Sequence, residues 1–260
     1  MTTASMDNVL RRASSLARRV TLRYPRLERL AIAALRFTAQ RFTRYPDLTL
    51  RARMLDHRDD DLAEYATRWG IRPPTLDRML REGLDTPGYR FRRDAAFYDY
   101  FASRTDLQGT SWLDVGAHSG CVDAYLSDML NATALELCDV DVVPKTAYPV
   151  RQIDGTRLDY PDGSFDLVFF TYVLHHAADH TLPLLRDAHR IARRHVVVLE
   201  DPKETEQDYR WAYRHDKAAT FRGLREWREL FDVLGFDVAY EAPLSDDIHS
   251  RHLYVLTPRA

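Results

Sequence analysis

Apolar positions repeat at helical intervals over about the first hundred residues. In the first segment they are Val9, Leu10, Ala13, Leu16, Ala17 and Val20. This three- and four-residue spacing predicts an amphipathic helix, with arginines on its other faces. Pro25 ends that segment, and a second helix is expected to run to about Tyr45-Pro46. Further helices are predicted over 59–69 and 74–83, and residues 90–104 carry an aromatic stripe.

From Ser111 onward the pattern changes to alternating strands and helices. We expect strands over 111–116, 133–138, 149–154, 165–171, 195–200, 236–241 and 252–257, and helices over 119–130, 180–193, 205–218 and 223–234. Such alternation predicts a mostly parallel sheet that is covered on both faces. The loop before the last strand is too short for a crossover helix, so that strand should be antiparallel. The link over 139–148 is also too short for a full helix.

The charge distribution divides the chain into a basic N-terminal region and an acidic remainder. Its 260 residues are enough for one large core with a smaller appendage. Residues 1–58 hold 13 arginines against four acidic residues, a net charge of +9, and the remainder carries −11. We therefore expect a basic helical head over 1–105 and an α/β domain over 106–260. The two cysteines indicate no disulfide framework and no metal cluster, which favours a cytoplasmic location.

The candidate chemistry lies where the first strand meets its helix, in the stretch SWLDVGAHSGCVDAYL over 111–126. Gly116 and Gly120 would let a ligand approach the backbone. Twenty residues after Gly116 comes Glu136, a carboxylate suited to ribose hydroxyls. Asp154-Gly155 follows the third predicted strand at the same edge of the sheet. The three features together predict a nucleoside site.

The glycine turn argues against two other ligands. A dinucleotide fingerprint needs a third glycine where this chain has His118, and a P-loop needs a lysine and a hydroxyl residue after the glycines. A nucleoside without phosphates therefore fits best.

Three stretches resemble class I S-adenosylmethionine-dependent methyltransferases of the small-molecule branch. They are Leu113-Asp-Val-Gly-Ala-His-Ser-Gly120, Leu135-Glu-Leu137, and the run from Asp154 through Ser-Phe-Asp-Leu-Val168 to Tyr172-Val-Leu-His-His176. The resemblance covers about 111–258. It implies a seven-stranded, mostly parallel, Rossmann-like α/β sheet with an antiparallel last strand, and S-adenosylmethionine as the cofactor.

The resemblance also implies roles for individual residues. Gly116, His118 and Gly120 would lie near the methionine part of the cofactor, with Asp114 holding its ammonium group. Glu136 would bind the ribose, Asp154 and Gly155 would meet the adenine, and Thr171 and Tyr172 would line the path to the acceptor. His118 and the missing helix after the second strand depart from the family pattern.

Methyl transfer needs alignment with the sulfonium, and some acceptors also need a base. The candidate bases are His175, His176, Glu200, Asp201 and His215. Each has an alternative interpretation: the histidines at 175 and 176 as packing residues of a helix start, His215 as a surface residue, and Glu200-Asp201 as a helix cap.

The expected function is methyl transfer to a small molecule at oxygen, nitrogen or activated carbon. Two alternatives stay open: an inactive cofactor-binding assembly protein, and a peripheral membrane enzyme acting on a lipid or quinone, which would place residues 1–45 on an anionic membrane surface. Nucleic acid is not an expected partner, because the fourth strand lacks the Asn/Asp-Pro-Pro-Tyr motif and the chain lacks a Pro-Cys nucleophile.

Overall fold

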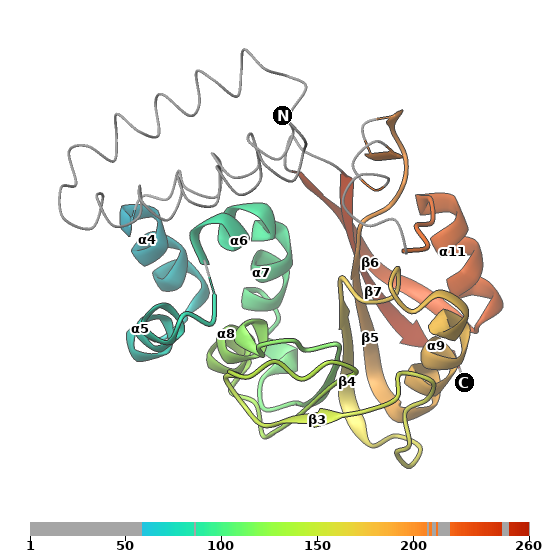
Figure 1. Ribbon diagram of the computed structural model, residues 1–260, viewed down its shortest axis with the longest axis horizontal. Coiled ribbons are helices and arrows are strands. Elements are labelled where there is room, and N and C mark those ends of the chain that lie inside the picture. The colour runs from blue at the N-terminus through green and yellow to red at the C-terminus, as the bar shows by residue number, and fades with distance from the viewer. Residues whose placement is uncertain are drawn as a thin grey trace, which may run out of the picture. The chain divides into compact units, whose positions relative to one another are not determined.

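The computed structural model describes residues 59–85, 87–206, 208–209, 212, 219–245 and 250–259. Asp59–Ala260 forms one compact unit, shown in Figure 1. The two N-terminal helices predicted before Pro46, and with them the basic segment over 1–58, lie outside the described residues. So does most of the helix predicted over 205–218.

A seven-stranded sheet forms the centre of this unit, in the order β3-β2-β1-β4-β5-β7-β6. Strands β1 to β5 run parallel, and β7 is antiparallel to both β5 and β6. The strands are β1 (Ser111–Val115), β2 (Ala134–Asp139), β3 (Val150–Gln152), β4 (Phe165–Thr171), β5 (Ala192–Glu200), β6 (Phe236–Ser245) and β7 (Ser250–Pro258). The predicted fold class and the antiparallel last strand are both confirmed.

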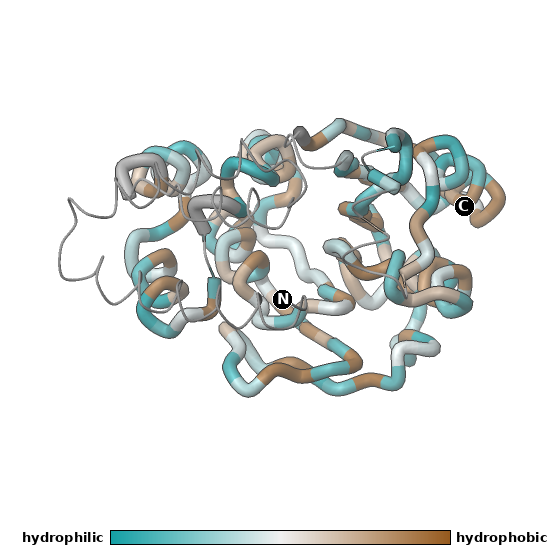
Figure 2. Tube along the Cα trace, turned by 45° about the horizontal axis from the view of Figure 1, so that its top comes forward, coloured by the Kyte–Doolittle hydropathy of each residue, from teal (hydrophilic) through white to brown (hydrophobic). Residues whose placement is uncertain are grey.

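The helices cover both faces of the sheet (Figure 1). They are α4 (Asp59–Trp69), α5 (Pro73–Glu82), α6 (Pro87–Arg93), α7 (Ala95–Ala102), α8 (Cys121–Leu130), α9 (Thr181–Ile191) and α11 (Leu224–Val233). Hydrophobic and hydrophilic residues alternate along them in Figure 2, as one buried helix face requires. The aromatic segment predicted over 90–104 is divided between α6 and α7 at Asp94.

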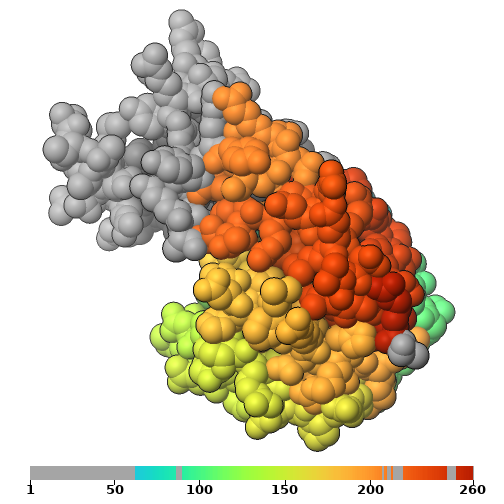
Figure 3. All heavy atoms as spheres, turned by 90° about the vertical axis from the view of Figure 1, so that its right-hand side faces the viewer, coloured from blue at the N-terminus to red at the C-terminus, as the bar shows by residue number. Residues whose placement is uncertain are grey.

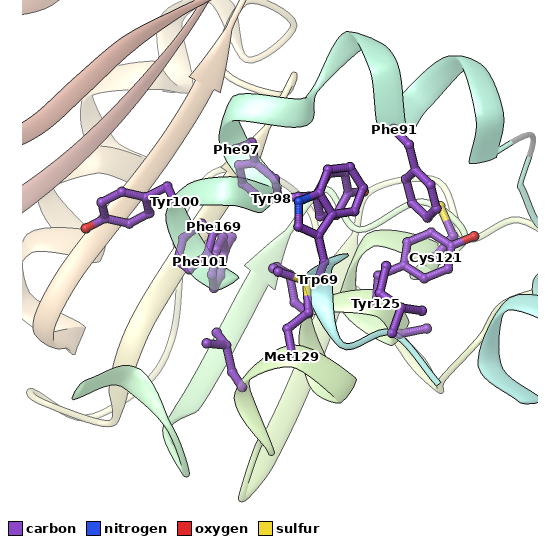
Figure 4. Packing of buried hydrophobic residues seen from close by; sticks show 14 of the residues in the cluster. Trp69, Phe91, Phe97, Tyr98, Tyr100, Phe101, Cys121, Tyr125, Met129 and Phe169 are labelled. Atoms are coloured by element: carbon purple, nitrogen blue, oxygen red, sulfur yellow. The ribbon is translucent and has the colours of Figure 1, made fainter. Parts of the chain in front are cut away.

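An aromatic core joins α4 to α8 and one face of the sheet (Figure 4). The Trp69 ring stacks on Tyr98 with centroids 4.7 Å apart, and Phe101 contacts Phe169 of β4 at 5.5 Å. Each such ring pair stabilises the fold by about 0.5–1.5 kcal/mol beyond its buried area. Residues 59–107 therefore belong to the same core as the sheet.

The opposite face of the sheet is covered by α9 and α11. Its core is mainly aliphatic, with Trp227 and Phe231 stacked at a centroid distance of 5.6 Å. Figure 3 shows this side of the molecule, where the yellow to red C-terminal part of the chain forms the surface. Since both faces are filled by side chains, a ligand must bind at an end of the sheet, where the carboxyl ends of β1, β2 and β4 meet.

Candidate functional site

The glycine turn joins β1 to α8 at the carboxyl edge of the sheet. Gly116 has φ +81°, and a Cβ there would lie 2.4 Å from Cγ2 of Val173. Gly120 has φ +67°, and its Cβ would lie 2.7 Å from Cδ2 of Leu137. Both positions therefore require glycine, for backbone conformation and for space.

His118 adopts φ +49°, the left-handed conformation that the replaced glycine would also reach easily. Its side chain is exposed, and its backbone N–H donates to Asp139 Oδ2 at 2.8 Å. The N–H groups of Gly116 and Ala117 donate to the Cys138 carbonyl. These three amides bond to the end of β2, so they are not available to a diphosphate.

Two carboxylates of β2 have different surroundings. Glu136 lies three residues before the end of the strand, where its Oε1 accepts a hydrogen bond from Tyr160 Oη at 2.5 Å and lies 3.3 Å from Arg151 Nε. Asp139 ends the strand and accepts the N–H groups of His118 and Asp141. The spacing in the sequence pointed to Glu136, but Asp139 is the carboxylate beside the glycine turn.

Val140 follows Asp139 and is 55% exposed, so its apolar side chain is accessible beside the end of β2. Gly155 packs beside it, since a Cβ on Gly155 would lie 2.7 Å from Val140 Cγ1. Asp154 is exposed and accepts hydrogen bonds from both Thr156 N and Thr156 Oγ1, which hold its pKa below the ordinary value. An apolar surface with a carboxylate at its edge suits a purine ring.

The segment after β2 forms no helix among its described residues, as expected. Ala147 N donates to Ser119 O at 2.7 Å, which ties this segment to the glycine turn. The Arg78 side chain of α5 donates to the Ala147 carbonyl. Helix α5 thus stabilises the side of the site that the missing helix would cover.

Asp114 of β1 and Asp123 of α8 form a buried acid pair behind the turn; they are 3% and 1% exposed. Burial raises the pKa of Asp114 well above its ordinary value, and the Asp123 carboxyl adds to the shift. Burial also raises the pKa of Asp123, whose Oδ1 accepts a hydrogen bond from Trp112 Nε1 at 3.2 Å. Burial of two neighbouring carboxyls favours the protonated form, because both members cannot ionise together in a dry site.

The loop after β4 turns sharply beyond Thr171, which is half-buried. Tyr172 adopts φ +60°, and its N–H donates to the Leu199 carbonyl of β5 at 2.7 Å. The next two amides, of Val173 and Leu174, donate to Oε1 of Glu200 at 3.1 and 2.6 Å. Glu200 is fully buried, and these bonds direct its side chain to the loop after β4.

The three candidate histidines do not share one environment. His175 is 4% exposed, and its Nδ1 lies 2.5 Å from Glu200 Oε2. The His176 side chain is exposed, with its ring 4.1 Å from that of His175. His215 lies outside the described residues.

Two arginine–aspartate pairs adjoin Tyr172. The Arg93 Nε donates to Asp94 Oδ1 at 2.7 Å, and Asp94 also accepts a hydrogen bond from Tyr172 Oη at 2.7 Å. Burial acts against ionisation of Asp94, but the charge and hydrogen bond of Arg93, the Arg90 charge and the Tyr172 hydrogen bond together outweigh it and lower the Asp94 pKa. Arg251 Nε lies 3.4 Å from Asp201 Oδ1, and both side chains are less than 10% exposed. One pair contacts Tyr172 directly after β4, and the other includes Asp201 directly after β5; we call the two pairs the polar cluster.

The site thus brings together Gly116, His118, Gly120, Asp154 and Gly155 from the sequence-based set, with Thr171 at the end of β4. Sequence reasoning missed Asp139 and the Arg93–Asp94 pair. The sequence could have indicated Asp139, because it is the first acidic residue after the apolar pair Leu137-Cys138 at the end of the predicted strand. No group of three metal-ligating side chains occurs in the part of the chain that the structure describes.

Residues 113–199 match the model of a methyltransferase domain family, which spans β1 to β5. Among solved structures, the methyltransferase in complex with the Trm112 activator from Haloferax volcanii is 18% identical, with a TM-score of 0.53 and coverage of 67% of this chain and 92% of that one. A Leishmania major S-adenosylmethionine-dependent methyltransferase is 15% identical, with a TM-score of 0.51 and coverage of 75% and 82%.

The magnesium protoporphyrin IX methyltransferase of Synechocystis PCC 6803, solved with bound S-adenosylhomocysteine, is 14% identical, with a TM-score of 0.50 and coverage of 75% and 99%. At these identities the likeness establishes the fold. No curated protein sequence matches the chain. None of the described helices is long and apolar enough to cross a membrane.

Proposed function

The chain is a methyltransferase that uses S-adenosylmethionine, and on that premise we propose that it methylates a small organic molecule at oxygen, nitrogen or activated carbon. The observation that carries the proposal is the burial of the polar cluster over β4 and β5. Asp94, Asp201 and Arg251 are 2%, 8% and 5% exposed. Buried polar side chains are reached more readily by a small acceptor than by a nucleic acid or a protein surface.

The ribose would be bound by Asp139, not by Glu136. Asp139 lies at the strand end and next to the turn, and each of its oxygens accepts a single N–H. A carboxylate oxygen has lone pairs for a further donor, so ribose hydroxyls can be added without breaking these bonds. Glu136 is already engaged by Tyr160 and Arg151 at mid-strand.

The adenine would lie against the exposed Val140 side chain, with Asp154 and Gly155 at its edge. The methionine part would pass over Gly116 and Gly120, with His118 beside it and Thr171 facing the acceptor. Asp114 is too deeply buried to be an open ammonium ligand, so it would support the turn from behind. When bound, S-adenosylmethionine supplies a sulfonium-linked methyl group.

The residues of this chain then have a limited task in catalysis. They hold the acceptor in line with the methyl group and exclude water from the site. The Arg93–Asp94 and Arg251–Asp201 pairs offer donors and acceptors that would orient a polar acceptor. His176 has an exposed ring at the loop end and remains our candidate for a base, where the acceptor needs one.

The Val173-Leu-His-His176 run after β4 further supports the small-molecule branch of these enzymes. An inactive cofactor-binding protein, or an enzyme for lipids or quinones with residues 1–45 on a membrane, would share the same cofactor site.

Label transfer separates these possibilities. The protein is incubated with S-adenosylmethionine carrying a radioactive methyl group and with a cell extract divided into small-molecule, lipid, protein and nucleic-acid fractions. The proposal predicts label in the polar small-molecule fraction. Label confined to lipid, protein or nucleic acid would contradict it, and no transfer to any fraction despite cofactor binding would favour the inactive alternative.

A further inference from the structure

We propose that Glu200, together with His175, is a positioning device that fixes the loop over 172–175 and thereby shapes the cofactor site. The inference rests on the proposed function, since it concerns the same site. It assigns His175 a positioning role through its Nδ1 atom.

The loop is built like an anion-binding nest. A left-handed residue, Tyr172 with φ +60°, precedes two amides that point at one carboxylate oxygen. Successive N–H groups in such a conformation create a concave positive site for an anion. Here the anion belongs to the protein itself, because Glu200 Oε1 receives both N–H groups.

The second oxygen of Glu200 holds the next residue of the loop. His175 Nδ1 lies 2.5 Å from Oε2, and the imidazole stacks on Phe221 with a centroid distance of 5.0 Å and an interplanar angle of 14°. The His175 carbonyl accepts the N–H of Thr220 at 2.7 Å. These contacts fix the ring with Nδ1 toward the carboxylate, which leaves that nitrogen occupied.

The loop acts on the cofactor site through Val173. Its Cγ2 lies 2.4 Å from where a Cβ on Gly116 would be, so Val173 packs directly on the glycine turn. The left-handed Tyr172 costs about 1–3 kcal/mol of backbone strain, which persists only while the surroundings impose it. Loss of the Glu200 anchor would let the loop relax and withdraw support from Gly116.

Binding of S-adenosylhomocysteine, measured by calorimetry, tests the proposal without a known acceptor. Glu200→Gln puts an amide where Oε2 faces the imidazole, and we expect affinity about tenfold weaker or more in a folded protein. His175→Ala should weaken binding in the same direction. His175→Asn should restore most of it, because the Asn side-chain N–H takes the place of Nδ1–H.

Asp166→Asn is the matched control. Asp166 accepts the N–H of Ser111 and pairs with Arg193 at the opposite end of β4, so its loss should lower stability but leave affinity unchanged. Should Glu200→Gln not fold, the two His175 variants test the same contact.

The outcomes separate the inference from its premise. Wild-type affinity in Glu200→Gln, or equal losses in His175→Asn and His175→Ala, would overturn the positioning role while wild type still binds. Failure of wild type itself to bind S-adenosylhomocysteine would instead contradict the cofactor site on which the proposed function rests.

Discussion

Asp139 and Glu200 are two carboxylates in similar backbone settings with opposite exposure to ligands. Each ends a parallel strand, and each accepts backbone N–H groups from a loop that contains a left-handed non-glycine residue, His118 or Tyr172. Asp139 lies in an accessible turn and receives one N–H on each oxygen. Glu200 is fully buried, and its two oxygens are surrounded by three backbone amides and one imidazole.

The comparison shows that position at a strand end does not by itself define a ligand-binding acid. A carboxylate with unused lone pairs at an accessible edge can bind hydroxyls, whereas one saturated by the protein can only position its surroundings. The Asp114–Asp123 pair is a third case: it is buried without enough donors, so it keeps a proton.

Gly116 joins the two regions, because its N–H donates to the Cys138 carbonyl of β2 while the Val173 side chain packs against it from the loop after β4. Gly116→Ala should lower the free energy of unfolding by about 2 kcal/mol or more, from the left-handed backbone and the clash together. Urea unfolding measures this. Gly70→Ala is the matched control, with φ +72° and nothing within 4 Å of its Cβ; equal losses in the two variants would contradict the packing of Val173 on Gly116.

The buried acid pair predicts a pH dependence. Its pKa values are raised in the folded state, so its stabilisation is present below the unfolded value near 3.8 and is lost as the pH rises through the raised value. Asp139 is the other charge that raises the Asp114 pKa. Between the unfolded pKa and the raised folded pKa, the free energy of unfolding should fall by about 1.4 kcal/mol per pH unit for each proton that the folded pair retains.

Asp123→Asn should make this slope shallower, because it removes the Asp123 carboxyl that adds to the raised Asp114 pKa, while the burial of Asp114 remains. Urea unfolding at several pH values between about 5 and 9 measures the slope in both proteins. Asp128→Asn serves as the control, because Asp128 lies on the same helix with a side chain 1% exposed but is paired with a cation, Arg72. An unchanged slope in Asp123→Asn would contradict a contribution of the Asp123 carboxyl to the raised pKa of Asp114.

Tyr172→Phe tests the acceptor side with the smallest expected effect. It removes the hydrogen bond from Tyr172 Oη to Asp94 but leaves the Arg93–Asp94 pair, so we expect a loss of about 1–2 kcal/mol in thermal or urea unfolding. Binding of S-adenosylhomocysteine should stay close to wild type, because Tyr172 Oη faces Asp94. A large loss of cofactor affinity would place the hydroxyl in the cofactor site.

The periodicity of the sequence was sufficient to predict all seven strands and the direction of the last one, because burial on both faces makes the strands of a parallel sheet strongly apolar. The glycine positions were also predictable, since their left-handed backbone needs a residue without Cβ. Exact strand ends were not: β2 runs one residue further than predicted, to Asp139, which is why we propose Asp139 beside the predicted Glu136 as the ribose-binding acid to be tested. The contacts of Glu200 and Asp94 link distant segments, which periodicity cannot reveal.

The most direct test is calorimetric titration of S-adenosylhomocysteine into wild type, Asp139→Asn and Glu136→Gln. Loss of a charge-assisted ribose contact should make Asp139→Asn bind about ten- to a hundredfold more weakly. Glu136→Gln should stay within about threefold of wild type, because it removes only a half-exposed ion pair with Arg151 and keeps an oxygen that can accept from Tyr160. Weak binding by Glu136→Gln with wild-type binding by Asp139→Asn would contradict the account.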